Sequence, residues 1–136
     1  MTGVMGSISV AQAVIDGFAA RDTERLVSLF TPDVQFDTRV DVIGAWRFRG
    51  HEGVRAWLAA VDEKYELFEV VEPDYRPGAG DAVFVSCHLR LQFAGDQYGM
   101  ARQLYWVFRV NDAGRISSFT SFRDLEEALA DAGLAA

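Results

Sequence analysis

Three charged residues of the sequence, Asp37, Asp41 and Arg102, could carry acid–base chemistry. A carboxylate beside a substrate can accept and return a proton, and a guanidinium can pair with a carboxylate or an enolate. Arg102 alternates with apolar residues in segment 98–110, so period-two geometry directs it towards a buried pocket or its rim. We predict these three residues as catalytic candidates. The alternatives are a structural ion pair for Arg102 and a solvated loop carboxylate for Asp41.

The other reactive side chains indicate structural roles. His51 lies at the predicted start of a helix, where a protonated imidazole is disfavoured. His88 and Arg90 fall on the polar side of an alternating segment, which predicts a surface or an interface, whereas Cys87 falls on its apolar side. The histidines and the cysteine lack metal-ligand spacing, and no glycine-rich phosphate loop is present. We therefore expect neither a metal nor a cofactor.

Apolar periodicity predicts two helices at the start of the chain. Ser9 begins a capping-box pattern, and apolar residues then recur at helical spacing over residues 9–21. Asp22 or Thr23 can cap a second, shorter helix, because both side chains accept hydrogen bonds from free backbone N–H groups. Pro32 disfavours helical geometry in the residue before it, so we expect the second helix to end there.

A strand, a loop and a third helix follow. Residues 34–38 alternate between apolar and polar, which predicts a strand with one buried face. Residues 39–50 mix arginines with large apolar side chains in no regular pattern, so we expect a loop that covers apolar surface. From Val54 to Tyr65, apolar residues recur at helical spacing, which predicts the third helix.

Turn signals divide the second half of the chain into a meander. Residues 77–81, 94–96 and 111–114 are rich in Gly, Asp and Asn, as hairpin turns require. Asp124 then caps a short C-terminal helix that ends at Gly133. The sequence thus predicts a single α+β domain over residues 1–136. The four predicted strands of the meander are 67–76, 82–93, 98–110 and 115–123.

Composition narrows the possible partners. The formal net charge is −7 and the pI is near 4.7, so nucleic acid and anionic lipid surfaces are repelled. The sequence has one cysteine and no apolar stretch long enough to span a membrane, which favours a cytoplasmic protein. Its first eight residues lack the pattern of a secretory signal, and we expect a flexible lead-in. Many aromatic residues favour a pocket for a small hydrophobic molecule.

Three segments resemble one protein family: LVSLFTPDVQF (26–36), FRGHEGVRAWL (48–58) and VFRVNDAGRISSFTSFRDLEEAL (107–129). They are similar to the SnoaL-like branch of the nuclear transport factor 2-like superfamily, which includes polyketide cyclases and relatives of ketosteroid isomerase and limonene-epoxide hydrolase. The resemblance spans about residues 9–130. It implies a conical fold in which three N-terminal helices pack on a curved, mainly antiparallel sheet with a short C-terminal helix. That scaffold hosts enzymes, carriers and association modules.

The resemblance also allows single positions to be compared with the family's catalytic residues. Leu89, Leu91 and Ser121 stand where the epoxide hydrolases carry Arg, Asp and Asp, so that catalytic constellation is absent. Thr38 stands at the position of the isomerase general base. Asp37 is one residue away and faces the other side of a regular strand, so it can act only if the strand twists or bulges.

The resemblance implies an enzyme that cyclises, isomerises or dehydrates a hydrophobic, carbonyl-bearing molecule by proton transfer. The alternative is a non-catalytic module that binds a ligand or a partner protein. A homodimer formed through the outer face of the sheet is expected in either case, as is common in the family. The residues predicted to line the pocket are Thr38, Trp46, Trp57, Leu89, Leu91, Leu104, Trp106, Phe119 and Ser121.

Overall fold

The computed structural model describes the chain over residues 4–37 and 47–134. Its four helices and six strands form the α+β architecture that the sequence predicts. The elements are α1 (Val4–Ala20), α2 (Thr23–Ser28), β1 (Phe30–Asp37), β2 (Arg47–Arg49), α3 (Gly50–Lys64), β3 (Tyr65–Pro77), β4 (Ala82–Phe93), β5 (Gly99–Val110), β6 (Ile116–Phe122) and α4 (Leu125–Asp131).

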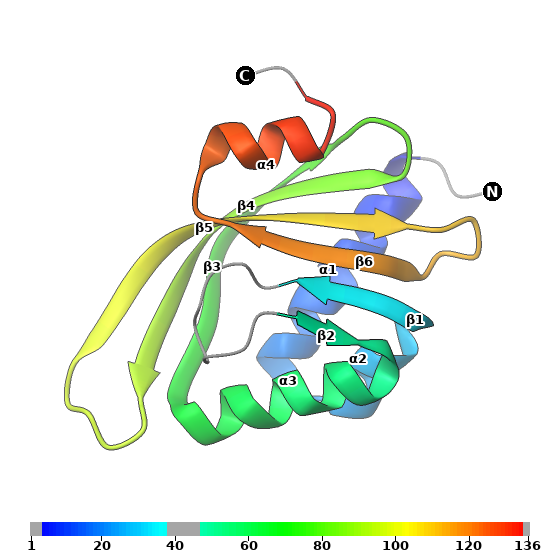
Figure 1. Ribbon diagram of the computed structural model, residues 1–136. Helices are drawn as coiled ribbons and strands as arrows, with labels where there is room; N and C mark the ends of the chain where they lie inside the picture. Colours follow the sequence, from blue (N-terminus) through cyan, green and yellow to red (C-terminus); the bar gives the residue numbers. More distant parts are fainter. Residues whose placement is uncertain (1–3, 38–46, 135–136) are drawn as a thin grey trace.

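The six strands form one mixed sheet in the order β2-β1-β6-β5-β4-β3. Strands β3 to β6 are the predicted meander, and each pairs antiparallel with the next. Strand β1 joins the sheet parallel to β6, with Phe36 opposite Phe119. Figure 1 shows β1 beside β6 and β2 at the edge of the sheet next to α3. The first and last strands in the sequence are therefore neighbours in the sheet.

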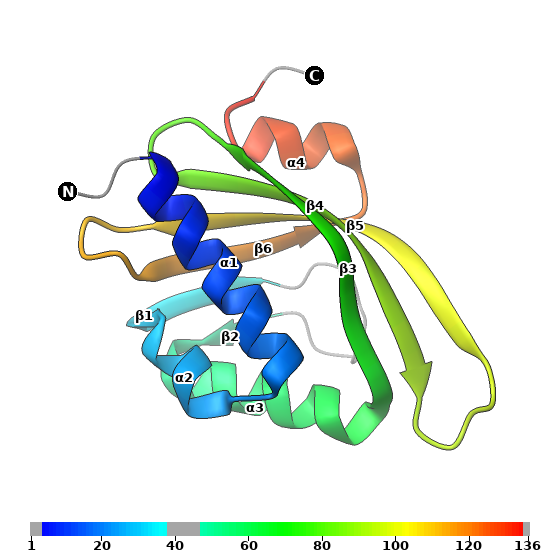
Figure 2. The same ribbon diagram turned by 180° about the vertical axis from the view of Figure 1, so that it is seen from behind.

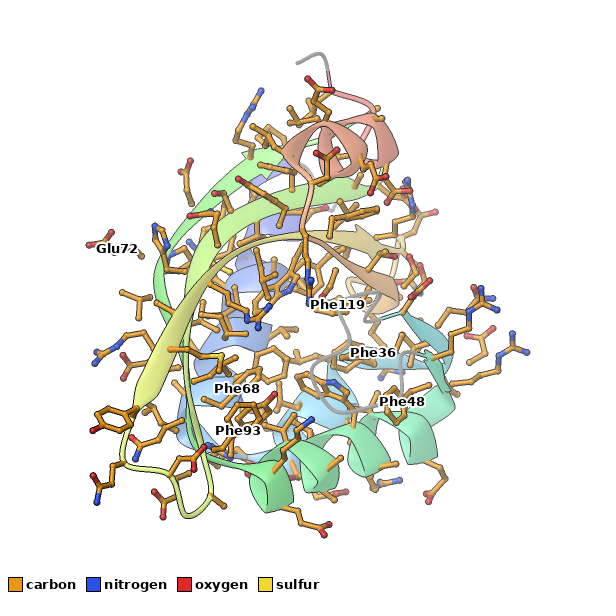
Figure 3. All side chains as sticks on the ribbon, turned by 60° about the vertical axis from the view of Figure 1, so that its left-hand side comes forward. Phe36, Phe48, Phe68, Glu72, Phe93 and Phe119 are labelled. Carbon is orange, nitrogen blue, oxygen red and sulfur yellow. The ribbon has the colours of Figure 1, made fainter. Side chains whose placement is uncertain are left out.

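A bulge in β3 contributes to the curvature of the sheet. The pairing of β3 with β4 shifts register between Val71 and Asp74, and Glu72 in that interval has a φ of 52°. An extra residue on one strand bends that strand and increases its twist. Figure 3 shows Glu72 directed away from the body of the protein, on the outside of the bend. Helix α1 crosses the opposite, concave side of the sheet (Figure 2).

Each side of the sheet has its own apolar core. The larger core lies on the concave side, where α1, α2 and α3 cover the sheet. The smaller one lies on the convex side under α4, where Phe84, Val107 and Phe122 contact Ala128 and Leu129. Asp124 caps α4 as predicted, because its carboxylate accepts a hydrogen bond from the N–H of Glu127 at 2.9 Å.

Two predictions for the N-terminal helices are wrong. Helix α1 begins at Val4, so residues 4–8 are not a flexible lead-in, and Ser9 lies inside the helix rather than at its N-cap. The apolar side chains of Ile8 and Val10 pack against the concave core, which extends the helix beyond the local cap signal. Asp22 does cap α2, accepting from the N–H of Arg25.

Two further predictions are wrong around β1. Helix α2 ends at Ser28, and Pro32 lies inside β1 instead of ending the helix. The strand tolerates this proline because the pairing of β1 with β6 is irregular between Phe30 and Gln35. Residues 47–49, predicted as part of a loop, form strand β2 against β1. Only three residues alternate there, too few to indicate a strand.

Candidate functional site

The concave face of the sheet is apolar along β4, as the alternation predicts. Val85, Cys87, Leu89 and Leu91 are each at most 2 % exposed. Strand β5 continues this face, because Leu104 pairs with Cys87 and Trp106 pairs with Val85. Residues directly opposite each other in an antiparallel pair point to the same side, so these side chains form one surface.

Aromatic rings from five elements lie over this surface. Phe36 of β1 stacks on Phe119 of β6 at 4.5 Å between ring centroids, and Trp57 of α3 lies 5.0 Å from Phe36. Trp57 also contacts Phe18 of α1 at 5.3 Å and Phe68 of β3 at 5.9 Å. In Figure 3, Phe36, Phe68 and Phe119 point into the space between the sheet and α3. Aromatic side chains therefore face the aliphatic surface of β4 across the interior.

The side chains around Trp57 leave little free space. The cavity beside Phe18, Trp57 and Phe68 measures about 10 Å³. That is about the space of one water molecule. A larger guest at this point therefore requires some of these aromatic side chains to move.

A few polar atoms interrupt the apolar interior. Ser121 is 5 % exposed and lies opposite Trp106 in the pairing of β5 with β6. Within the described residues, the indole Nε1 of Trp106 and the hydroxyl of Thr31 are buried without a hydrogen-bond partner. Such an atom costs about 1–3 kcal/mol because its hydrogen bonds to water are lost and not replaced. Sequence reasoning did not find Thr31, which follows buried Phe30 and breaks the strict alternation of the strand.

Arg102 lies at the open end of the concave face. It pairs with Leu89, which is 1 % exposed, so its side chain starts from the concave side of the sheet. The residue itself is exposed, and within residues 4–37 and 47–134 its side chain makes no hydrogen bond or ion pair. The structural ion pair considered for Arg102 is therefore absent from this part of the chain. Its guanidinium is accessible to a ligand at the rim.

Asp37 lies on the other side of β1. Gln35, Phe36 and Asp37 pair in consecutive register with both β2 and β6, and Phe36 points into the core. No bulge turns Asp37 inward there. It lines a cavity of about 300 Å³ with Arg47 and Arg49, and Phe36 and Phe48 also border this cavity. Three other predicted site residues, Thr38, Asp41 and Trp46, lie outside the described residues.

The structural roles predicted for several other reactive residues are confirmed. His51 Nε2 lies 2.9 Å from the carbonyl oxygen of Phe30, which ties the start of α3 to β1. His88 and Arg90 are exposed on the convex face, where Arg90 pairs with Glu69 at 3.3 Å. Burial raises the pKa of the Cys87 thiol to about 12, so this residue is not an activated nucleophile.

Other ionisable groups were not singled out by the sequence. Burial raises the pKa of Tyr75 on β3 to about 12, with a smaller contribution from Asp16 of α1. The hydrogen bond from Arg55 holds the pKa of the Glu24 carboxyl below its usual value. This ion pair joins α3 to α2 at 3.1 Å. No cluster of metal-ligating side chains exists among residues 4–37 and 47–134.

A second cavity, of about 350 Å³, includes Val83 and Val110 of the larger core among its lining residues. Ser7, the β3–β4 turn and the β5–β6 turn line it, and it carries the carboxylates of Asp81 and Asp112. Asp81 already pairs with Arg109 at 3.1 Å. We assign this cavity no chemistry.

The family follows from comparison with known proteins. The SnoaL-like domain family matches residues 11–119, which is well over half of the chain. The chain belongs to this family. No curated protein matches it significantly. None of the helices in the described ranges is long and apolar enough to cross a membrane.

Several solved structures share the fold of this SnoaL-like protein. A protein of ketosteroid isomerase-like fold from Catenulispora acidiphila, in complex with trimethylamine, is 23 % identical with a TM-score of 0.74, and 93 % of each chain is covered. TerC, co-crystallised with polyporic acid, is 21 % identical with a TM-score of 0.75, covering 93 % of this chain and 97 % of the other. A candidate polyketide cyclase from Xanthomonas campestris is 17 % identical with a TM-score of 0.75, covering 95 % and 98 %. These likenesses establish the nuclear transport factor 2-like fold.

Proposed function

We propose that the protein binds a hydrophobic, carbonyl-bearing small molecule against the concave face of its sheet. One observation carries this proposal: the interior is a continuous apolar and aromatic surface that also contains the indole Nε1 of Trp106, which is buried and unpartnered within the described residues. Ligand sites are typically apolar cavities with a few polar groups that orient the ligand. TerC, which has the same fold, was co-crystallised with the small molecule polyporic acid.

Methyl NMR with α-tetralone and polyporic acid as probes tests this proposal. We expect the methyl signals of Leu89, Leu91 and Leu104 to shift as the probe is added, because these side chains form the concave face. Val107 and Leu129 in the convex core are the control, since they lie on the other side of the sheet. Shifts confined to the convex core would contradict the proposal.

Proton-transfer catalysis is the second candidate, and Arg102 is the observation that favours it. An exposed guanidinium without a described partner can stabilise an enolate at the rim of the concave face. The candidate polyketide cyclase from Xanthomonas campestris has the same fold. Against this candidate, the described concave face carries no carboxylate, so the base would have to be Asp37 in another position or Asp41.

Hydrogen exchange at carbon separates catalysis from binding. In heavy water, an enzyme that enolises α-tetralone speeds the loss of the proton next to the carbonyl, and NMR measures this rate. We expect Arg102→Ala to lower the accelerated rate, and Asp37→Ala and Asp41→Ala to identify the base. Arg90→Ala on the convex face is the matched control. If the wild-type protein binds α-tetralone without speeding this exchange, it is a carrier or a binding module.

We further propose a homodimer formed through the convex face of β3 to β5. His88 and Arg90 are exposed there, and the Gln103 amide donates a hydrogen bond to the Ser86 hydroxyl at 3.0 Å, so the face is polar and ordered. Size-exclusion chromatography with light scattering should give twice the chain mass of 15.1 kDa. A mass of one chain refutes the dimer. A cytoplasmic location stays an expectation from the sequence.

A further inference from the structure

The indole N–H of Trp106 is a hydrogen-bond donor without an acceptor. Trp106 lies in the middle of β5 on the concave face and is 2 % exposed. Its Nε1 atom is buried and has no hydrogen-bond partner within the described residues. Buried tryptophan N–H groups normally find a partner, because losing water without replacing it costs free energy. The indole N–H of Trp106 is therefore an unsatisfied donor among the described residues.

Aromatic rings make up most of the surroundings of Trp106, and the hydroxyl of Ser121 opposite it accepts no hydrogen bond from the indole. Phe18 of α1 lies 6.3 Å from it in an edge-on arrangement, and Phe119 of β6 lies 5.4 Å away. Phe108, two residues along β5, completes the group at 6.4 Å. A weak contact between the N–H and an aromatic face is the alternative explanation, and it leaves most of the lost hydrogen-bond energy unrecovered. A carbonyl oxygen would recover more.

Ser121 provides a second donor beside the first. It pairs directly with Trp106 across β5 and β6, so both side chains rise from the same side of the sheet. Directly opposed residues have Cβ atoms about 5 Å apart. At that separation one oxygen atom can accept hydrogen bonds from both the indole and the hydroxyl. Ser121 is also almost completely buried, at 5 % exposed, so water competes little for this position.

We propose that the indole N–H of Trp106 and the hydroxyl of Ser121 together bind the carbonyl oxygen of the ligand. This inference rests on the proposed function, because it places a ligand on the concave face. The pair gives the site a preference for ketones, quinones and enolates over hydrocarbons of the same shape. It also fixes the orientation of the ligand, with its oxygen against β5 and β6 and its rings among the phenylalanines.

The affinity ratio for α-tetralone over tetralin measures this preference. The two probes share a bicyclic skeleton and differ at the carbonyl, so the ratio isolates the oxygen. We expect Trp106→Phe to lower the ratio by about tenfold, the usual effect of one buried hydrogen bond. Ser121→Ala should lower it by a smaller factor. Trp57→Phe is the matched control, because it makes the same chemical change on α3 and should lower both affinities and leave the ratio unchanged.

The carbonyl stretching frequency of bound α-tetralone gives a second readout. A hydrogen bond lowers this frequency, so it should rise on Trp106→Phe and on Ser121→Ala but not on Trp57→Phe. If Trp106→Phe does not fold, Ser121→Ala remains as a test, because it removes a single oxygen atom. A lower affinity ratio together with a higher carbonyl frequency in Ser121→Ala would then support the donor pair.

The possible outcomes separate the inference from the proposed function. If tetralin and α-tetralone both bind and neither the ratio nor the frequency responds to the two substitutions, the donor pair is refuted while the binding site stands. If neither probe binds, the proposed function fails for ligands of this size, and the donor pair fails with it. A lowered ratio in Trp57→Phe equal to that in Trp106→Phe would also overturn the assignment.

Discussion

The substitution Leu89→Ala tests whether the concave face is a packed core in the absence of ligand. Leu89 is 1 % exposed and belongs to the larger apolar core. Removing three buried carbon atoms loses about 2.4 kcal/mol of transfer free energy at about 0.8 kcal/mol each. The space left behind adds to this loss, so we expect the free energy of unfolding to fall by about 3–4 kcal/mol, within the usual range for such changes.

Urea denaturation measures the effect through the midpoint, with an unchanged slope if the unfolding remains two-state. Leu125→Ala is the matched control, because Leu125 is 44 % exposed on α4. A surface change of this kind costs at most about 0.5 kcal/mol. If Leu89→Ala costs no more than the control, the concave face is not packed as described, and the reasoning from burial is wrong.

The same variant has a consequence for binding. An engineered apolar cavity stays dry and accepts small aromatic molecules. Benzene should therefore raise the melting temperature of Leu89→Ala more than that of the wild-type protein, since a ligand of the native state stabilises it. An equal response in both proteins would mean that the interior collapses around the missing side chain.

Three further predictions concern single residues. Asp124→Ala removes the cap of α4 and should cost about 1 kcal/mol in urea denaturation, whereas Asp124→Asn should restore most of it. Gly133→Ala should cost more than about 1 kcal/mol, because its φ is 73° and the new methyl group would lie 2.5 Å from Cβ of Ala79; a melting temperature equal to wild type would contradict this. Burial raises the pKa of Cys87 from 9.0 to about 12, so the unfolded chain loses this proton first as the pH rises. Stability should then fall between about pH 9 and 12, and the decline should be shallower in Cys87→Ala.

The sequence by itself determined the elements whose signals are local. The apolar face of β4 follows from alternation alone, since successive side chains of a strand point to opposite sides. The turn residues predicted the β3–β6 meander, and Asp22 and Asp124 predicted the starts of α2 and α4. Family resemblance added the fold.

Only the tertiary structure decided how distant segments meet. The parallel pairing of β1 with β6 joins residues more than 80 positions apart in the sequence, and no local pattern specifies such a partner. Strand β2 exists because β1 offers it an edge, and α1 begins at Val4 because its first turns find a core to pack on. Each of these outcomes depends on contacts that form only when the chain is folded.

In the candidate site, too, the sequence determined some features and the tertiary structure decided others. Period-two alternation placed Trp106 in the interior and the family resemblance placed Ser121 there, but the strand register made them direct neighbours. Whether the indole finds an acceptor depends on every side chain that packs around it, from α1 as well as β6. The sequence shows which side chains can donate a hydrogen bond. That the Trp106 indole has no partner follows only from how the folded interior packs around it.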